Sequence, residues 1–117
     1  MLQAHTYDKA DESLRDLMYV PPEVLSGRGV TQCTDWYRLG LVLFEMLVGQ
    51  PPFLADTKHE VLNNSLNGEL VFPECVSDEA ADFICRLLEK NPTMRLGGMV
   101  GIEEVKSHPF FKGIKWT

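Results

Sequence analysis

The segment from Trp36 to Val48, "WYRLGLVLFEMLV", would carry apolar side chains on nearly every side if it formed a helix. Only Arg38 and Glu45 are clearly polar within it. Thr34 or Asp35 is suited to begin the helix, because either side chain can accept a hydrogen bond from a free backbone N–H. A helix that is apolar all round has to be buried on all sides. The sequence therefore predicts a central helix that the rest of the fold must surround.

Two further segments predict amphipathic helices. Residues 58–67 follow Thr57, which heads the capping-box pattern "TKHE", and Gly68 ends that helix. Its inward residues are expected to be Val61, Leu62 and Leu66. Residues 78–90 follow Ser77 as the cap, and Asn91-Pro92 ends them. The apolar residues of this second helix recur at spacings of three and four: Ala80, Phe83, Ile84, Leu87 and Leu88.

The remaining segments add only short elements. Residues 23–25 predict a brief turn after two prolines, and residues 102–107 predict a short helix that stops before Pro109. No segment alternates convincingly enough to predict a strand. The fold class is therefore mainly α, but these helices offer too few apolar faces to surround residues 36–48. We expect the chain to be a piece of a larger domain whose other parts provide the cover.

Charge and composition exclude several classes of protein. The formal net charge of −6 argues against nucleic acid or an anionic membrane as the main partner. The longest apolar run, residues 39–44, is far shorter than the ~20 residues that a membrane span needs. The opening residues lack the apolar core of a secretory signal, so we expect a cytoplasmic location, with the nucleus as the alternative. The three cysteines and three histidines lack metal-ligand spacing, which predicts reduced thiols and no metal site.

Four motifs stand in a fixed order: "PPEVL" at 21–25, "DWYRLGLVLFEMLVGQPPF" at 35–53, "NPTMRLGG" at 91–98 and "HPFF" at 108–111. In this order they resemble the C-terminal lobe of protein serine/threonine kinases of the AGC group, which includes the protein kinase C-related and ribosomal S6 kinases. The resemblance covers residues 19–117. It implies a partial kinase C-lobe, with helices from the end of the activation segment onward and no N-lobe. Residues 1–18 are interpreted as a divergent, disordered lead.

The resemblance also implies structural roles for single residues. Glu23, in the position of the A-P-E glutamate, is expected to pair with Arg95. Asp35 is expected to hold the backbone of the catalytic loop in a whole kinase. The positions that match structural kinase motifs are Pro22, Glu23, Asp35, Trp36, Gly40 and Arg95. The surface that many kinases use for docking is expected at Phe53, Thr57 and Glu60.

Some positions depart from the family pattern. Tyr37 and Arg38 stand where tryptophan and serine are usual, and Arg38 has to point outward beside an apolar axis. The threonine that faces substrate is replaced by Asp16. The position of the activating phosphothreonine falls on Glu12, which either imitates a phosphate weakly or belongs to unrelated sequence.

The motifs of phosphoryl transfer are missing from these 117 residues. "GRGVTQ" at 27–32 lacks the third glycine of a phosphate-binding loop and follows no predicted strand. There is no V-A-I-K lysine, no H-R-D-x-x-x-x-N loop and no D-F-G. We therefore expect no catalytic, cofactor-binding or metal-binding residues in this chain. The resemblance implies that ATP and Mg²⁺ serve only the complete parent kinase.

Three hypotheses for function stay open at this point. In the first, the chain is a truncated or incompletely defined product of an AGC-type kinase gene, inactive by itself, whose parent transfers the γ-phosphoryl of ATP to serine or threonine. In the second, it is a non-catalytic docking or scaffold module that binds protein substrates or a kinase N-terminal half. In the third, it is a decayed gene copy without function.

Overall fold

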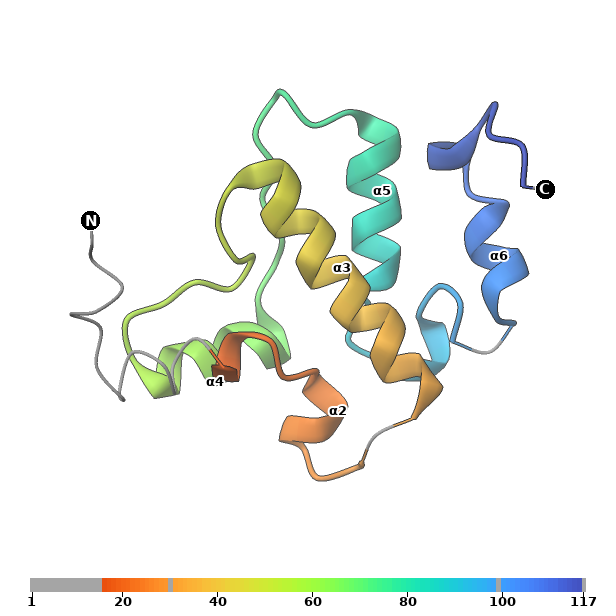
Figure 1. The fold of residues 1–117 in the computed structure, drawn as a ribbon. Helices are drawn as coiled ribbons and strands as arrows, with labels where there is room; N and C mark the ends of the chain where they lie inside the picture. Colours follow the sequence, from red (N-terminus) through yellow and green to blue (C-terminus); the bar gives the residue numbers. More distant parts are fainter. Residues whose placement is uncertain (1–15, 30, 99, 117) are drawn as a thin grey trace.

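The computed structural model describes residues 16–29, 31–98 and 100–116, which form helices and turns without a strand. The mainly α fold is therefore confirmed over the described ranges. Figure 1 shows one long helix through the middle of the molecule with a second helix packed beside it. The elements are α2 (Pro22–Leu25), α3 (Gln32–Val48), α4 (Lys58–Asn67), α5 (Asp78–Leu87) and α6 (Ile102–Lys106), with 3-10 turns η2 (Pro92–Met94) and η3 (Pro109–Phe111).

Helix α3 begins earlier than the sequence predicts. Thr31 is the cap: its hydroxyl accepts the Cys33 N–H at 3.2 Å, and the Thr34 hydroxyl accepts the Thr31 N–H at 3.1 Å. Thr34 and Asp35 thus lie inside the first turn, and the prediction that one of them caps the helix was wrong. The reason is that two threonines at this spacing satisfy free N–H groups reciprocally. The helix ends as predicted at Gly49, whose φ of 95° is readily adopted only by glycine.

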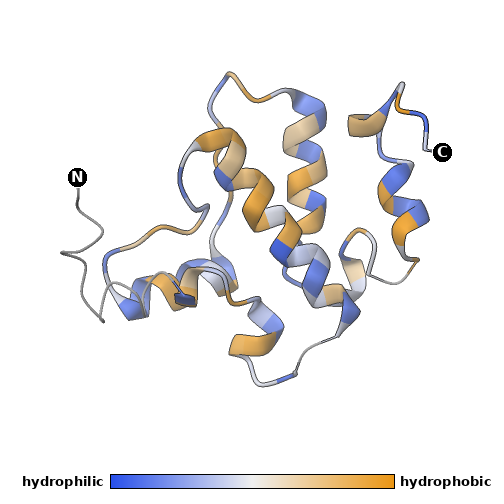
Figure 2. Cartoon of the chain, viewed as in Figure 1, coloured by the Kyte–Doolittle hydropathy of each residue, from blue (hydrophilic) through white to orange (hydrophobic). Residues whose placement is uncertain are grey.

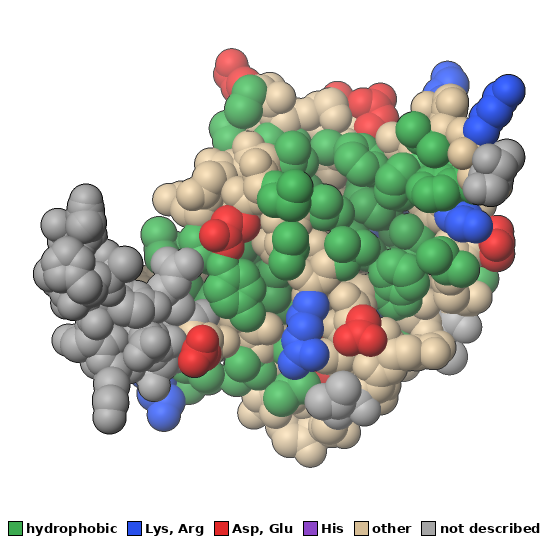
Figure 3. Space-filling model, viewed as in Figure 1, with side chains coloured by type: hydrophobic (Ala, Val, Ile, Leu, Met, Phe, Trp, Pro, Cys, Tyr) green, Lys and Arg blue, Asp and Glu red, His purple; other side chains and the backbone are tan. Residues whose placement is uncertain are grey.

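Helix α3 is not buried on all sides within the described part of the chain. Tyr37 and Leu41 are fully buried, but Val42 is 49% exposed and Met46 is 73% exposed. Figure 2 shows hydrophobic residues along much of α3, and Figure 3 shows hydrophobic side chains gathered on the same face of the molecule. Among the described residues, α5 and the loop after α3 cover one side of the helix only, which agrees with the expectation that this chain has too few apolar faces to surround it. Arg38 is exposed, as its charge requires.

Helix α5 lies against α3 with the predicted apolar stripe. Ser77 caps it by accepting the Ala80 N–H at 3.1 Å, and all five predicted residues are buried. The helix ends at Leu87, three residues before the predicted end, because Leu88 already leaves helical geometry. Asn91 instead caps η2, where its side chain accepts the Thr93 N–H. The short helix predicted over residues 102–107 is α6, with Ser107 as its C-terminal cap.

Helix α4 keeps its predicted cap but turns a different residue inward. Thr57 accepts the Glu60 N–H at 3.2 Å, while its hydroxyl donates to the Glu60 carboxylate. Val61 and Ser65 are buried, since residues four apart share one face of a helix. Leu66 is 37% exposed, so the prediction that it faces inward was wrong.

Residues 16–18, the described part of the segment that was predicted to be disordered, form a helical turn. Residues 16–18 are helical and Met18 is buried, so an extended or disordered state was the wrong prediction for them. Glu12 and the rest of the lead lie outside the described residues. No helix in the described ranges has the length and hydropathy needed to cross a bilayer.

Two apolar clusters share α5. One contains Tyr37, Leu41, Phe44, Phe53, Ile84 and Leu88, and the other contains Phe83, Leu87, Leu96 and Val105. Gly40 on α3 lies directly against the end of α5. A Cβ atom added there would come within 2.9 Å of Leu87 Cβ and 2.8 Å of Leu88 Cδ2. The absence of a side chain at this position therefore sets the distance between α3 and α5.

We expect Gly40→Val to destabilise the chain by about 1–3 kcal/mol, because the new side chain would overpack the α3–α5 contact. Urea unfolding followed by far-ultraviolet circular dichroism measures this free energy. Leu39→Val is the control, because it places the same β-branched residue on the neighbouring, exposed position. Equal stability of the two variants would show that the close approach does not constrain the packing.

Candidate functional site

A buried ion pair joins the start of the described chain to its C-terminal half. Glu23 on α2 and Arg95 after η2 are 72 residues apart in sequence, and both are almost inaccessible to solvent. Arg95 Nη1 donates to Glu23 Oε2 at 2.8 Å, and Nη2 donates to Oε1 at 3.0 Å. Two parallel hydrogen bonds of this kind fix orientation as well as distance. The pair predicted from the sequence is present.

The remaining hydrogen-bonding groups of this pair are also occupied. Arg95 Nη1 donates to the Cys33 carbonyl oxygen at 2.9 Å, and Nε donates to the Glu89 carbonyl oxygen at 3.0 Å. The Thr34 hydroxyl donates to Glu23 Oε2 at 2.9 Å. These contacts connect α2, the first turn of α3 and the segment after α5. A buried charge is stable only when it is paired and hydrogen-bonded, and this arrangement meets both conditions.

The aromatic ring of Tyr37 closes the site from the α3 side. The Arg95 guanidinium carbon lies 4.8 Å from the centre of this ring, a distance that suits a cation–π contact. Burial raises the pKa of Tyr37, and its hydroxyl has no partner among the described residues. Burial also raises the pKa of Glu23, but hydrogen bonds from Arg95, its own backbone and Thr34 outweigh burial and leave that pKa below its usual value. Glu23 is therefore ionised at neutral pH, as the ion pair with Arg95 requires.

Three other residues of the predicted kinase motifs lie near this pair in the sequence or the fold, and their side chains differ in exposure to solvent. Pro22 is buried at the start of α2, and Trp36 is half-buried against Gly97, where an added Cβ would come within 2.9 Å of the indole ring. Asp35 is exposed in the first turn of α3 and does not join the ion pair. Its expected contact with a catalytic loop stays a prediction.

The predicted docking residues are not brought together on one surface. Thr57 and Glu60 are exposed at the start of α4, but Phe53 is only 3% exposed. Phe53 packs in the cluster with Tyr37 and Leu41, so placing it on a docking surface was wrong. An aromatic residue after a Pro-Pro turn can pack into the core as readily as face a partner, and the sequence contains no signal that separates the two.

Sequence reasoning missed Lys90. Its ammonium lies 3.7 Å from the centre of the Phe53 ring and donates to the Asn64 carbonyl oxygen at 3.4 Å. Burial first, and then repulsion from Arg95, lower the pKa of Lys90 to about 8. A lysine in "LLEKNP" is typical of a solvated residue at a helix end. Only the tertiary packing places the Asn64 carbonyl of α4 and the Phe53 ring beside it.

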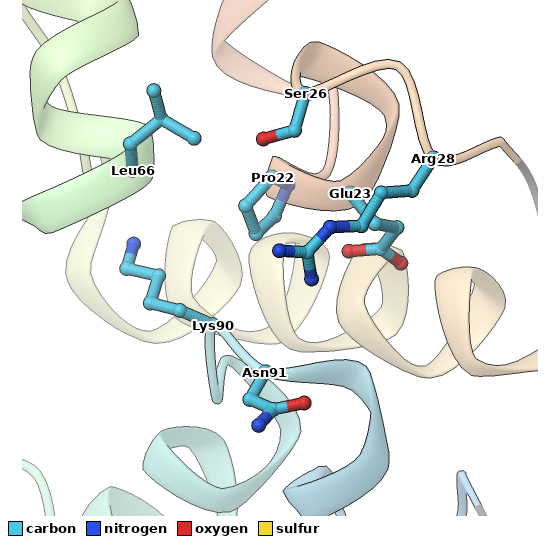
Figure 4. Close-up of a pocket in the computed structure, with 7 residues that line it drawn as sticks. All are labelled: Pro22, Glu23, Ser26, Arg28, Leu66, Lys90 and Asn91. Carbon is cyan, nitrogen blue, oxygen red and sulfur yellow. The ribbon is translucent and has the colours of Figure 1, made fainter.

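Beside this ion pair lies a cleft of about 280 Å³, lined by Pro22, Glu23, Ser26, Arg28, Leu66, Lys90 and Asn91 (Figure 4). These residues do not fit ATP with Mg²⁺. Glu23, the only carboxylate among the described residues that line the cleft, already binds Arg95 through both oxygens, so it has little capacity left for a metal. Elsewhere in the described ranges, no three His, Cys, Asp or Glu side chains cluster closely enough to hold a metal ion.

Comparison with known proteins gives one consistent result. A family model described as "Protein kinase domain" matches residues 2–111, which includes most of the lead that the sequence analysis set apart. "Serine/threonine-protein kinase N2" of Danio rerio is 44% identical over 99 residues, covering 84% of this chain and 10% of that protein. "Protein kinase 3" of Dictyostelium discoideum is 41% identical over 98 residues, covering 84% of this chain and 11% of that protein.

The match extends over a larger share of one plant relative. "Protein kinase PINOID 2" of Oryza sativa subsp. japonica is 40% identical over 109 residues, covering 85% of this chain and 22% of that protein. This chain therefore spans between about a tenth and a fifth of the length of these curated relatives.

We expect Arg95→Gln to lower the free energy of unfolding by about 3–5 kcal/mol, because it leaves the Glu23 carboxylate buried without its partner. Arg86→Gln is the matched control. It breaks the Arg86–Asp82 pair, whose side chains are 61% and 51% exposed, and exposed pairs contribute about 0–1 kcal/mol. Urea unfolding of both variants measures the difference. Similar losses in the two variants would contradict a special role for the buried pair.

The lowered pKa of Glu23 also predicts a dependence on pH. The folded state holds this carboxylate ionised, so its contribution is fully present above the unfolded pKa of Glu and is lost as pH falls through the folded pKa. The stability difference between wild type and Glu23→Gln should therefore be largest near pH 7 and shrink as the pH falls below about 4. Unfolding curves at pH 7, 5, 4 and 3 measure it. A difference that is constant over this range would contradict the prediction.

Proposed function

Because the chain belongs to the protein kinase family, and its relatives are serine/threonine kinases of the AGC type, we propose that it has a structural role within a kinase C-lobe. These 117 residues alone transfer no phosphate. The observation that carries the proposal is the ion pair between Glu23 and Arg95. It is the most organised polar cluster of the described residues, and its groups are occupied by protein partners rather than open to a substrate.

In the complete kinase, this ion pair would hold the end of the activation segment against the base of the lobe. Phosphoryl transfer needs bound phosphates, a metal ion and a positioned hydroxyl group. The sequence contains none of the motifs for those tasks, so other segments of the kinase would supply them. The complete protein would transfer the γ-phosphoryl of ATP to serine or threonine with Mg²⁺.

The exposed side of α3 supports a place inside a larger lobe. Its apolar residues Leu39, Val42, Met46 and Leu47 are all at least 37% exposed. A shallow groove of about 480 Å³ lies there between Tyr19, Val42, Glu45 and Met46. Contiguous apolar surface of this kind marks a site that another protein surface covers. The much greater length of the relatives makes further segments of the same kinase the candidate cover.

A second candidate function is a non-catalytic docking module. The same exposed face of α3 favours it, because a separate kinase N-terminal half or a protein substrate could cover those residues. Thr57 and Glu60 add an exposed polar edge at the start of α4. In this case the 117 residues would act by binding and not by catalysis.

We expect the purified chain to produce no phosphopeptide above an enzyme-free blank when it is incubated with ATP, Mg²⁺ and serine- and threonine-containing peptides. A circular dichroism spectrum with a helical minimum at 222 nm first establishes that the sample is folded. A full-length AGC-type kinase in the same assay is the positive control. Phosphopeptide formation that follows the amount of the chain would contradict the proposal.

Co-expression with the preceding part of a related kinase domain separates the two candidates. If α3 is a covered axis of one lobe, the two parts should co-purify, and Val42→Glu with Met46→Glu should abolish the complex. Val71→Glu is the control, because Val71 is 80% exposed outside α3. A stable complex formed with a substrate protein, but not with the kinase part, would favour the docking module instead.

A further inference from the structure

The cleft beside the ion pair has a composition that the structural role does not explain. It is formed by α2 and the loop after it, by α4 and by the segment that follows α5. Its polar lining is rich in hydrogen-bond donors, namely Ser26, Arg28, Lys90 and Asn91. Figure 4 shows the Ser26 hydroxyl, the Arg28 guanidinium and the Lys90 ammonium around one opening. Two separate segments, the one around α2 and the one after α5, therefore bring donors to one place, and α4 adds the apolar Leu66.

The charge of the cleft is positive although the chain as a whole is negative. Glu23 is the only acidic residue among the described residues that line it, and both of its oxygens are bound by Arg95. The Arg28 side chain is exposed and makes no ion pair or hydrogen bond with any residue that the structure describes. Lys90 has a lowered pKa of about 8, and most of it therefore stays charged at neutral pH. The Lys90 ammonium already donates to the Asn64 carbonyl oxygen and lies over the Phe53 ring, but an ammonium has three N–H groups and can still donate to a ligand. Two cations thus border one concave site, which strengthens their field.

The apolar part of the lining adds a second requirement. Pro22 and Leu66 lie on the walls of the same cleft, and Leu66 is 37% exposed. A ligand that carries only charge would leave this apolar surface in water. A side chain with an anionic end, next to an apolar neighbour, would satisfy both parts of the lining.

We propose that this cleft binds an acidic peptide segment of a protein partner, with a carboxylate or phosphate group between Arg28 and Lys90 and an apolar residue against Pro22 and Leu66. Arginine recognises both anions through paired N–H groups, and the Ser26 hydroxyl can donate a further bond. The site is separate from the exposed face of α3. It does not depend on kinase activity.

A lipid surface fits these observations less well. Recognition of anionic lipids usually takes clusters of 4–8 basic residues, whereas two cations, Arg28 and Lys90, are among the described residues that line this cleft. The net charge of −6 also repels an anionic bilayer. A peptide can enter a concave site of about 280 Å³ while the rest of its chain avoids that repulsion.

Fluorescence polarisation with two labelled peptides tests the proposal. The acidic probe is GSLEELSG and the neutral probe is GSLQQLSG, so they differ only in charge. We expect saturable binding of the acidic probe, about tenfold tighter than that of the neutral one. Inorganic phosphate should compete with it, and raising the salt concentration should weaken it. Equal affinity for the two probes, or no saturable binding, would overturn the proposal.

Matched variants locate the site. Arg28→Gln should weaken binding of the acidic probe about tenfold, whereas Arg38→Gln, which removes the same charge from an exposed position on α3, should change it less than about twofold. Ser26→Asp adds a negative charge to the exposed rim of the cleft and should also weaken binding of the acidic probe. This second variant keeps the proposal testable if Arg28→Gln fails to fold. Equal losses in Arg28→Gln and Arg38→Gln would show general charge attraction and overturn the site. Anionic vesicles that bind through Arg28, without binding of the peptide, would overturn the choice of ligand.

Discussion

The rest of the structure depends on the buried ion pair between Glu23 and Arg95. It joins segments 72 residues apart, and its side chains also bind Thr34, the Cys33 carbonyl group and the Glu89 carbonyl group. Such a pair gains little free energy over a well-packed apolar substitute, but the loss of one partner strands the other charge. It therefore imposes one arrangement on α2, α3 and the segment after α5. The close approach at Gly40 imposes a second constraint, since α5 can then lie directly on α3.

These two constraints explain the division of surfaces around α3. One side of the helix carries Tyr37, Leu41 and Phe44, which are buried against α5 and the loop containing Phe53. The opposite side has no cover among the described residues, and its apolar residues remain exposed. One side of α3 is thus packed and lies beside the hydrogen-bonded ion pair, whereas the apolar side chains on its other side are exposed to solvent. This asymmetry is what a kinase C-lobe segment would show if further segments of the kinase completed the lobe.

Much of the fold was predictable, because local signals dominated it. The Ser77 and Thr57 caps, the α5 stripe and the stop at Gly49 follow from hydrogen bonding and periodicity over a few residues. The Glu23–Arg95 pair came from resemblance to kinases and not from spacing. The predictions of the α3 cap and of the inward face of α4 were wrong because neighbouring residues are each suited to the same position. Thr31 and Thr34 could each cap α3, and Leu66 and Ser65 could each face inward. The cap went to the residue that completed a reciprocal pair of hydrogen bonds, and the inward face followed Val61.

By itself, the sequence determined the helical class, most helix ends and the family, since these rest on short-range hydrogen bonding, apolar periodicity and ordered motifs. Only the tertiary structure decided which sides of those helices are covered and which distant residues meet. Phe53 went into the core and Lys90 came to lie over it, although neither position has a local signal for that outcome. The cleft with Arg28, Lys90 and Leu66 exists for the same reason. Burial and proximity depend on the joint packing of α2, α4 and α5, which no local stretch of sequence specifies.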